Sequence, residues 1–180
     1  MLRKFNFFRF FTDKKGKTYQ TREVKLGTSN YIVRPVHTND IKDLISIERE
    51  IYKEDIPWTR SAFLSELYTT APHRYLLVQK EEKTIGFIGC RISKKDAHIT
   101  NVAISIDHQG KGIGSFLVRE MIFFAQNNKC DTVSLEVRIS NKKAQSVYRK
   151  AGFVSTSIKK NYYDNDFEDA LEMIFQLKEG

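Results

Sequence analysis

The chain has 180 residues, of which 41% are hydrophobic, which is enough for one sizeable core but too little for two domains. Its two cysteines and four histidines lack the number and spacing that a disulfide framework or a metal cluster requires, so no metal is expected. The net charge of +8 lies mostly in residues 1–30, where eight Lys and Arg stand against two acidic residues, a balance of +6 that leaves +2 for the rest. We therefore predict a basic, aromatic-rich N-terminal extension over 1–30 and one domain over 31–180, without a general nucleic-acid-binding face on the domain.

The extension begins MLRKFNFFRFF, in which aromatic residues alternate with cations. Arg9 interrupts the apolar stretch that a secretory signal needs, and no later segment reaches the ~18 consecutive apolar residues of a membrane span. We therefore expect a cytoplasmic protein. The Phe and Arg run has three interpretations: weak contact with RNA or the ribosome, attachment to a membrane surface, or packing on the domain as a tail or an added strand. A cleaved organelle-targeting segment fits less well, because of Asp13 and the scarcity of serine.

The remaining chain alternates strand and helix patterns, starting with a strand over 31–35. Asn39 and Asp40 precede a first helix, and a second helix begins near Thr59. Three strands separated by short turns then require antiparallel hairpins, whereas the next strand follows a long helix, which suits a parallel crossover. The expected ranges are 75–79, 84–93 and 97–106 for the three strands, 113–128 for the long helix, 132–137 for the next strand, and 153–160 with 170–176 for a closing hairpin. These elements predict a mixed, mostly antiparallel central sheet flanked by helices, of the α/β (α+β) class.

A glycine-rich turn joins the third of these strands to the long helix. The strand pattern of Ile99–Ile106 ends in Gln109-Gly110-Lys111-Gly112-Ile113-Gly114, and apolar residues at helical spacing follow. The turn lacks the spacing of a nucleotide-triphosphate loop and of the dinucleotide fingerprint. Glycines at the start of a helix expose N–H groups that have no partner within the helix, and the helix dipole there favours an anion. The turn therefore predicts a pyrophosphate site, although a short glycine-rich turn can also serve only to reverse the chain.

Further motifs follow in order, and together they carry a family resemblance. The segment Thr132–Val137 leads into Arg138-Ile139-Ser140-Asn141, and Ala151-Gly152-Phe153 closes a short helix. With Ile56-Pro57-Trp58-Thr59 upstream and Lys160-Asn161-Tyr162-Tyr163 downstream, the chain resembles the GNAT superfamily of N-acetyltransferases over roughly 31–175. Within the superfamily it is similar to the RimI-like ribosomal-protein alanine N-acetyltransferases. The resemblance implies a GNAT-like sheet, with a splayed parallel strand pair at the cofactor site.

The resemblance also implies acetyl-CoA as cosubstrate and a set of residues that bind it. In the family, backbone amides hold the arm of the cofactor and polarise its acetyl carbonyl, and here these would belong to Val102 and Ala103. The diphosphate would lie on Gln109, Gly110, Lys111, Gly112, Ile113 and Gly114, although Lys111 is equally well explained as a solvated loop lysine. Asn141 and Tyr148 would also contact the cofactor.

The implied chemistry needs a base and an acid, because a terminal amine with a pKa of roughly 7.7–8.0 arrives mostly protonated. Glu136 matches the general base of the family, acting directly or through a water, and Tyr148 matches the general acid. Their alternatives are an ordinary carboxylate at a strand end and a core aromatic. Cys90 and Cys130 match no nucleophile position, so we expect direct transfer to the amine without an acyl-enzyme.

The implied acceptor is the N-terminal α-amine of a protein, specifically the N-terminal alanine of a small-subunit ribosomal protein, which would be basic. Trp58, Tyr162 and Tyr163 lie in segments that resemble the peptide-binding loops of the RimI-like group. Two other functions stay open: acetylation of a small-molecule amine or a lysine side chain, and a non-catalytic acetyl-CoA-binding or ribosome-bound module. The sequence does not indicate an oligomeric state.

Overall fold

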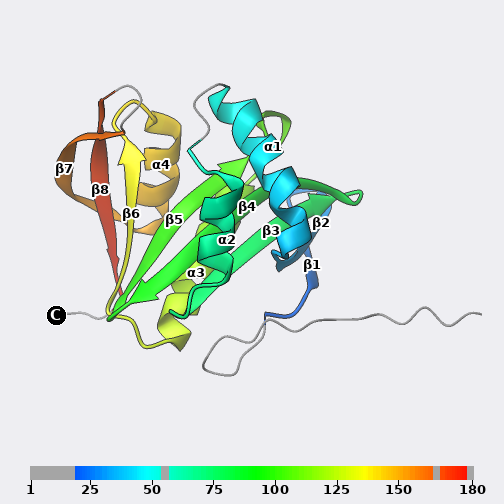
Figure 1. Ribbon diagram of the computed structural model, residues 1–180, viewed down its shortest axis with the longest axis horizontal. Coiled ribbons are helices and arrows are strands. Elements are labelled where there is room, and N and C mark those ends of the chain that lie inside the picture. The colour runs from blue at the N-terminus through cyan, green and yellow to red at the C-terminus, as the bar shows by residue number, and fades with distance from the viewer. Residues whose placement is uncertain (1–18, 54–56, 164–166, 178–180) are drawn as a thin grey trace, which may run out of the picture.

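The computed structural model describes residues 19–53, 57–163 and 167–177, which form one sheet with helices on both faces (Figure 1). The sheet has eight strands in the order β1-β2-β3-β4-β5-β6-β8-β7. The strands are β1 (Arg22–Leu26), β2 (Ser29–Pro35), β3 (His73–Lys80), β4 (Lys83–Ser93), β5 (Asp96–Ile104), β6 (Thr132–Arg138), β7 (Val154–Tyr163) and β8 (Glu168–Gln176). The helices are α1 (Ile41–Tyr52), α2 (Arg60–Leu67), α3 (Ile113–Asn127) and α4 (Lys142–Ala151), with short 3-10 turns at Thr38–Asp40 and Ile106–His108. The predicted class is confirmed.

The sheet begins inside the predicted N-terminal extension. Strand β1 pairs antiparallel with β2, so the boundary predicted between residues 30 and 31 does not mark the edge of the folded domain. Arg22 reaches from β1 to α3, where its Nη2 lies 2.5 Å from Glu120 Oε1. Residues 22–26 of the predicted extension therefore add an edge strand to the sheet. The Phe and Arg run at residues 5–11 lies outside the described residues.

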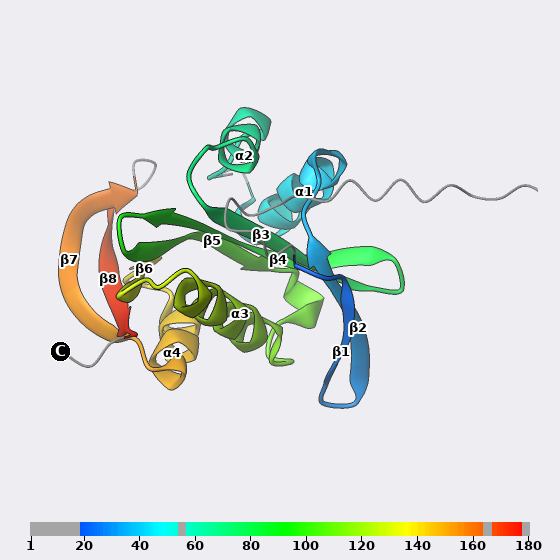
Figure 2. The ribbon, with the colours of Figure 1, turned by 90° about the horizontal axis from the view of Figure 1, so that it is seen from below.

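The helices cover the sheet in two layers, with α1 and α2 on one face and α3 and α4 on the other (Figure 2). On the first face, Leu44 of α1 and Phe63 of α2 are fully buried in one core cluster. On the second face, Leu117 and Phe124 of α3 are fully buried in a larger cluster. The apolar periodicity therefore predicted correctly which sides of these helices face the sheet. No helix among the described residues is long and apolar enough to cross a membrane.

Strands β5 and β6 are parallel neighbours that separate after a short contact. Only Asp96–His98 pair with Thr132–Ser134, although β5 continues to Ile104 and β6 to Arg138. Figure 1 shows the two strands starting side by side and diverging toward their carboxyl ends. The predicted parallel crossover and its splayed pair are both present.

A bulge in β5 lies where the two strands begin to diverge. Gly89 of β4 pairs with Asn101 while the next residue, Cys90, pairs with Ile99, so Thr100 is an extra residue in β5. The Tyr75 ring from β3 lies against Gly89, and its hydroxyl is 2.7 Å from the Thr100 hydroxyl. A bulge bends its strand and increases its twist, so this contact helps to turn the end of β5 away from β6.

The close contact at Gly89 yields a stability prediction. In Gly89→Ala the new Cβ would lie 2.2 Å from the Tyr75 ring, which is buried and hydrogen-bonded, so we expect the free energy of unfolding to fall by about 1–3 kcal/mol. Gly114→Ala is the control, because its Cβ would lie 4.0 Å from the nearest atom, within a helix, and should cause no loss. Urea unfolding of both variants checks this, and an unchanged stability in Gly89→Ala would contradict it.

Candidate active site

The glycine-rich turn leaves the start of α3 open. Gly110 and Gly112 have φ values of +75° and +82°, a left-handed conformation that other residues rarely adopt. A Cβ at either position would meet nothing within 4 Å, so both face open space. Gly112 is the N-cap residue of α3, no side chain of the described residues caps this end, and Ile113 and Gly114 form its first turn. The backbone here has the openness and the dipole that a diphosphate requires.

Side-chain contacts within the turn fix its shape. Gln109 Nε2 donates to the carbonyl oxygen of Ile104 at 3.0 Å, and His108 Nδ1 lies 2.9 Å from Ser105 Oγ. The side-chain amide of Gln109 thus stabilises the turn by bonding to its own backbone. Burial lowers the pKa of His108, and the charge of the exposed Lys111 lowers it further. The local field is therefore positive, which favours an anionic ligand.

Val102 and Ala103 lie in the part of β5 that has separated from β6. Both pair with β4, opposite Ile88 and Phe87, whereas the pairing with β6 has ended at His98. Backbone groups on the β6 side of this segment therefore lack a strand partner. An extended ligand could form hydrogen bonds along this edge, as an added strand would.

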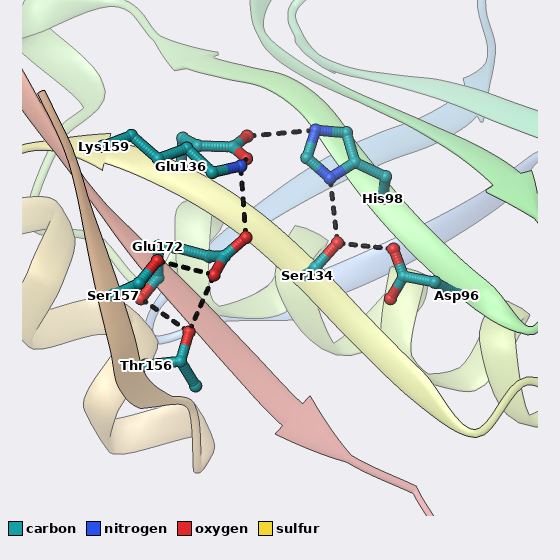
Figure 3. A network of polar contacts seen from close by, with 8 residues as sticks. All are labelled: Asp96, His98, Ser134, Glu136, Thr156, Ser157, Lys159 and Glu172. Atoms are coloured by element: carbon teal, nitrogen blue, oxygen red, sulfur yellow. Dashed lines mark hydrogen bonds and ion pairs between the residues drawn. The ribbon is translucent and has the colours of Figure 1, made fainter. Parts of the chain in front are cut away.

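Glu136 lies on β6, two residues beyond the last residue that pairs with β5. Its carboxylate contacts two nitrogen-bearing side chains: the ammonium of Lys159 of β7 through Oε1, and the imidazole of His98 of β5, whose Nε2 is 3.2 Å from Oε2 (Figure 3). Burial alone would raise the pKa of Glu136, but hydrogen bonds from His98 and Lys159 outweigh it and lower the pKa to about 2. The predicted base is therefore an ionised carboxylate with a side chain only 10% exposed.

The partners of Glu136 belong to a longer polar network that the sequence interpretation missed. His98 Nδ1 lies 2.9 Å from Ser134 Oγ, which donates to Asp96 at 2.5 Å, and all three side chains lie on the strands that splay (Figure 3). On the other side, Lys159 also contacts Glu172 of β8 at 3.1 Å. In the sequence, His98 stood out only as one of four histidines without the spacing of metal ligands. Knowledge of the β5–β6 register, which pairs His98 with Ser134, would have predicted that His98 lies close to Glu136.

The structure places Tyr148 in the core and Asn141 at the start of α4. Tyr148 is 6% exposed, and its ring centroid lies 6.0 Å from that of Phe153. Burial raises the pKa of its hydroxyl, with smaller contributions from Tyr52 and Tyr163, so the hydroxyl stays protonated. Asn141 caps α4, because its carboxamide oxygen accepts from Ala144 N at 3.0 Å. The position of Tyr148 is compatible with both the acid and the core interpretation.

Tyr162 and Tyr163 form an aromatic pair at the end of β7, beside Glu136. Their ring centroids are 5.2 Å apart in an edge-to-face arrangement. The Arg138 guanidinium lies 4.0 Å from the Tyr163 centroid, and Lys159 Nζ lies 5.7 Å from that of Tyr162. Of the three residues predicted to contact the acceptor, Tyr162 and Tyr163 therefore lie near Glu136, the predicted base.

Trp58 lies on the face of the sheet that α1 and α2 cover. Its ring centroid is 5.4 Å from that of Phe63, and its backbone N–H donates to Glu48 Oε2 at 3.2 Å. Burial raises the pKa of Glu48 to about 8, and the Trp58 N–H opposes this rise. A buried carboxyl group of α1 therefore anchors the segment that carries Trp58.

The described residues around Glu136 include neither a metal-ligand cluster nor a cysteine. Among the described residues, no group of three or more His, Cys, Asp or Glu could hold a metal ion. Cys90 and Cys130 are both buried members of the larger core cluster. The polar groups gathered near the position where β5 and β6 separate include the Glu136 carboxylate, the His98 imidazole, the Lys159 ammonium and the phenols of Tyr162 and Tyr163.

A sheet whose parallel strands separate beside an open, glycine-lined helix start is typical of enzymes that transfer an acyl group from coenzyme A. Residues 40–153, more than half of the chain, match the family described as "Acetyltransferase (GNAT) family". The chain therefore belongs to this family, is an N-acetyltransferase by class, and shares the dependence of GNAT acetyltransferases on acetyl-CoA.

Similar proteins narrow the class further. The "Putative [ribosomal protein bS18]-alanine N-acetyltransferase" of Bacillus subtilis is 35% identical over 147 residues, covering 82% of this chain and 96% of that protein. The "[Ribosomal protein bS18]-alanine N-acetyltransferase" of Haemophilus influenzae is 32% identical, covering 73% and 87%. Among solved structures, the ribosomal-protein-S18-alanine N-acetyltransferase from Escherichia coli aligns with a TM-score of 0.73 at 25% identity, covering 83% of this chain and 96% of that one.

The lowered pKa of Glu136 predicts a stability difference that depends on pH. Because the folded pKa of about 2 is below the ordinary value of 4.5, the stabilisation that ionised Glu136 contributes is complete above about pH 4.5 and is lost as the pH falls toward 2. Wild type should therefore exceed Glu136→Gln in unfolding free energy near neutral pH, and the difference should shrink over this interval. Urea unfolding between pH 7 and pH 2.5 measures it, and a difference that stays constant would contradict the ion-pair interpretation.

Proposed function

We propose that this enzyme transfers an acetyl group from acetyl-CoA directly to the N-terminal alanine of a small-subunit ribosomal protein of the bS18 type. The observation that carries the proposal is the position of Glu136, an ionised carboxylate where β5 and β6 separate, with an aromatic pair beside it. The names of the relatives from Bacillus subtilis and Haemophilus influenzae support the acceptor.

The residues on the α3 side fit acetyl-CoA. Backbone N–H groups of Gln109, Gly110, Lys111, Gly112, Ile113 and Gly114 would hold the diphosphate, and the open space at Gly110 and Gly112 leaves room for it. Val102 and Ala103 would bind the arm along the free edge of β5, and Asn141 would contact it from the start of α4. When bound, the cosubstrate supplies a thioester carbonyl. Oriented amides of β5 would stabilise the negative charge that develops on the carbonyl oxygen.

Glu136 and Tyr148 would manage the two protons of the reaction. The acceptor arrives as an ammonium ion, and ionised Glu136 attracts and orients it. Since the pKa of Glu136 lies several units below that of an amine, the carboxylate would stay ionised, and the ammonium would lose its proton to solvent through a water hydrogen-bonded to Glu136. Tyr148, whose hydroxyl is held protonated by burial, would donate to the departing sulfur. Tyr162, Tyr163 and Trp58 would contact the first residues of the acceptor.

A peptide panel tests the acceptor. We expect mass spectrometry to show acetylation at the α-amine of peptides that begin with alanine and carry the N-terminal sequence of a bS18 protein, with slower reaction when residue one is changed. Peptides blocked at the α-amine but containing lysine, and small amines, are the controls. Faster reaction with either control would instead identify a lysine or small-molecule acetyltransferase. The absence of any acetylation, with coenzyme A still bound, would indicate a non-catalytic module.

Removing the predicted base tests the mechanism. Glu136→Gln keeps the shape of the side chain but removes its charge, so we expect acetyl transfer to slow by about 10²–10⁴-fold while the affinity for coenzyme A, measured by calorimetry, stays the same. Glu120→Gln is the matched control, since it makes the same change on α3, where Glu120 pairs with Arg22. A Glu136→Gln enzyme that transfers at the wild-type rate would remove Glu136 from this role.

A further inference from the structure

Lys159 contacts two carboxylates that lie on neighbouring strands. Its Nζ reaches from β7 to Glu136 Oε1 of β6 and lies 3.1 Å from Glu172 Oε1 of β8 (Figure 3). The Lys159 side chain is 38% exposed, whereas those of Glu136 and Glu172 are 10% and 26% exposed. The ammonium group therefore bridges an inner carboxylate, which belongs to the active site, and an outer one that is closer to solvent.

The ammonium group of Lys159 is the same chemical group as the amino terminus of an acceptor. Both are primary alkylammonium ions at neutral pH, and each would form its strongest contact with Glu136. If both bound there together, two like charges would lie within a few ångströms of each other and would repel strongly at the effective dielectric constant of a site near the surface. Exchange of one ammonium for the other avoids this repulsion.

The structure provides a second place for Lys159. Glu172 accepts hydrogen bonds from Ser157 Oγ at 2.8 Å and from Thr156 Oγ1 at 3.1 Å, so its carboxylate stays in position without Glu136. The hydrogen bond from Ser157, followed by that from Lys159, lowers the pKa of Glu172, which keeps it ionised. The Tyr162 ring, 5.7 Å from Lys159 Nζ, offers an aromatic surface to a cation at the same position.

We propose that Lys159 is an internal competitor for the acceptor site: it occupies Glu136 when no acceptor is bound, and it retreats to Glu172 when the α-ammonium of the acceptor takes its place. The inference rests on the proposed function, because it assumes that the acceptor nitrogen reaches Glu136. It implies that the acceptor enters as a cation. It also implies that the enzyme binds its acceptor less tightly than a site without Lys159 would.

Charge-removing and charge-keeping substitutions test the proposal. Lys159→Met retains most of the side-chain length without the charge, so the KM for a peptide that begins with alanine should fall by about 5-fold or more, with a smaller change in kcat. Lys159→Arg should keep the wild-type KM because it keeps the charge. Lys160→Met is the matched control on the same strand, where Lys160 is 76% exposed and pairs with Asp169 at 2.6 Å, and it should change neither constant.

Glu172→Gln provides a test in the opposite direction. Of the two carboxylates that Lys159 contacts, this substitution removes the outer one and leaves Glu136. Lys159 should then compete more strongly for Glu136, so the KM for the same peptide should rise. This variant keeps Lys159 and the shape of the Glu172 side chain, so it still tests the proposal if Lys159→Met does not fold. An unchanged KM in folded Glu172→Gln, or an unchanged or raised KM in folded Lys159→Met, would overturn the proposal.

Two further measurements distinguish competition from a structural effect. The acetylated product peptide has no ammonium group, so its dissociation constant should be the same for wild type and Lys159→Met, and equal tightening of product and substrate would argue against competition. The acidic limb of the kcat/KM profile should move to higher pH in Lys159→Met and not in Lys160→Met, because Glu136 would then lose its ammonium partner and keep the contact with His98 of β5, with Tyr162 of β7 and Glu172 of β8 nearby. If wild type acetylates no α-amine at all, the proposed function fails, and this outcome is separate from failure of the competition.

Discussion

The structure depends on a parallel contact between β5 and β6 that is only three residues long. On one side of it lie β1 to β5, joined by antiparallel pairs, and on the other lies the three-stranded unit of β6, β8 and β7. Asp96 reinforces the contact, because its two carboxylate oxygens accept from Thr132 at 2.6 Å and from Ser134 at 2.5 Å. Asp131 N also donates to the Lys95 carbonyl oxygen at 2.7 Å. The strands are thus held firmly at one end and left apart at the other.

The same contact links stability to chemistry. Hydrogen bonds across the two strands connect Asp96 to Ser134 and Ser134 to His98, and His98 Nε2 in turn contacts the Glu136 carboxylate. The side chains that hold the strands together therefore also orient the carboxylate at the position where they separate. In the proposed function, backbone groups of the free edge of β5 would bind the cosubstrate, and side chains that continue from the paired segment would provide the charge. A single register fixes both, since a shift by one residue would turn Glu136 to the opposite face of the sheet.

Much of the fold could be predicted because the local patterns agree with the final environment. The apolar residues at helical spacing in the long helix, Ile113, Phe116, Leu117, Met121 and Phe124, are all buried in α3. The short turns at Glu81-Glu82 and Lys94-Lys95 do form hairpins, in which Glu81, Glu82 and Lys94 take positive φ values. Strand β1 was missed because Arg22, Glu23 and Lys25 of this edge strand are exposed, so it lacks a buried alternation. The glycine-rich turn and Glu136 were located by motif, whereas His98 and Lys159 were not. The contacts of both residues depend on how distant strands are aligned in the sheet. Strand β7 is exposed along nearly its whole length, so its sequence pattern does not indicate that Lys159 contacts a buried carboxylate.

The bulge at Thr100 has a consequence for the donor side of the enzyme. Tyr75 rests on Gly89 and is hydrogen-bonded to Thr100 within the core cluster that contains α1 and α2, on the face opposite α3. The inclination of β5, and with it the separation of β5 from β6, thus depends on a phenol that lies on the far side of the sheet. Repacking under α1 and α2 would be transmitted through this ring, so the side chains of one face of the sheet would adjust the site proposed for the donor without touching the donor itself.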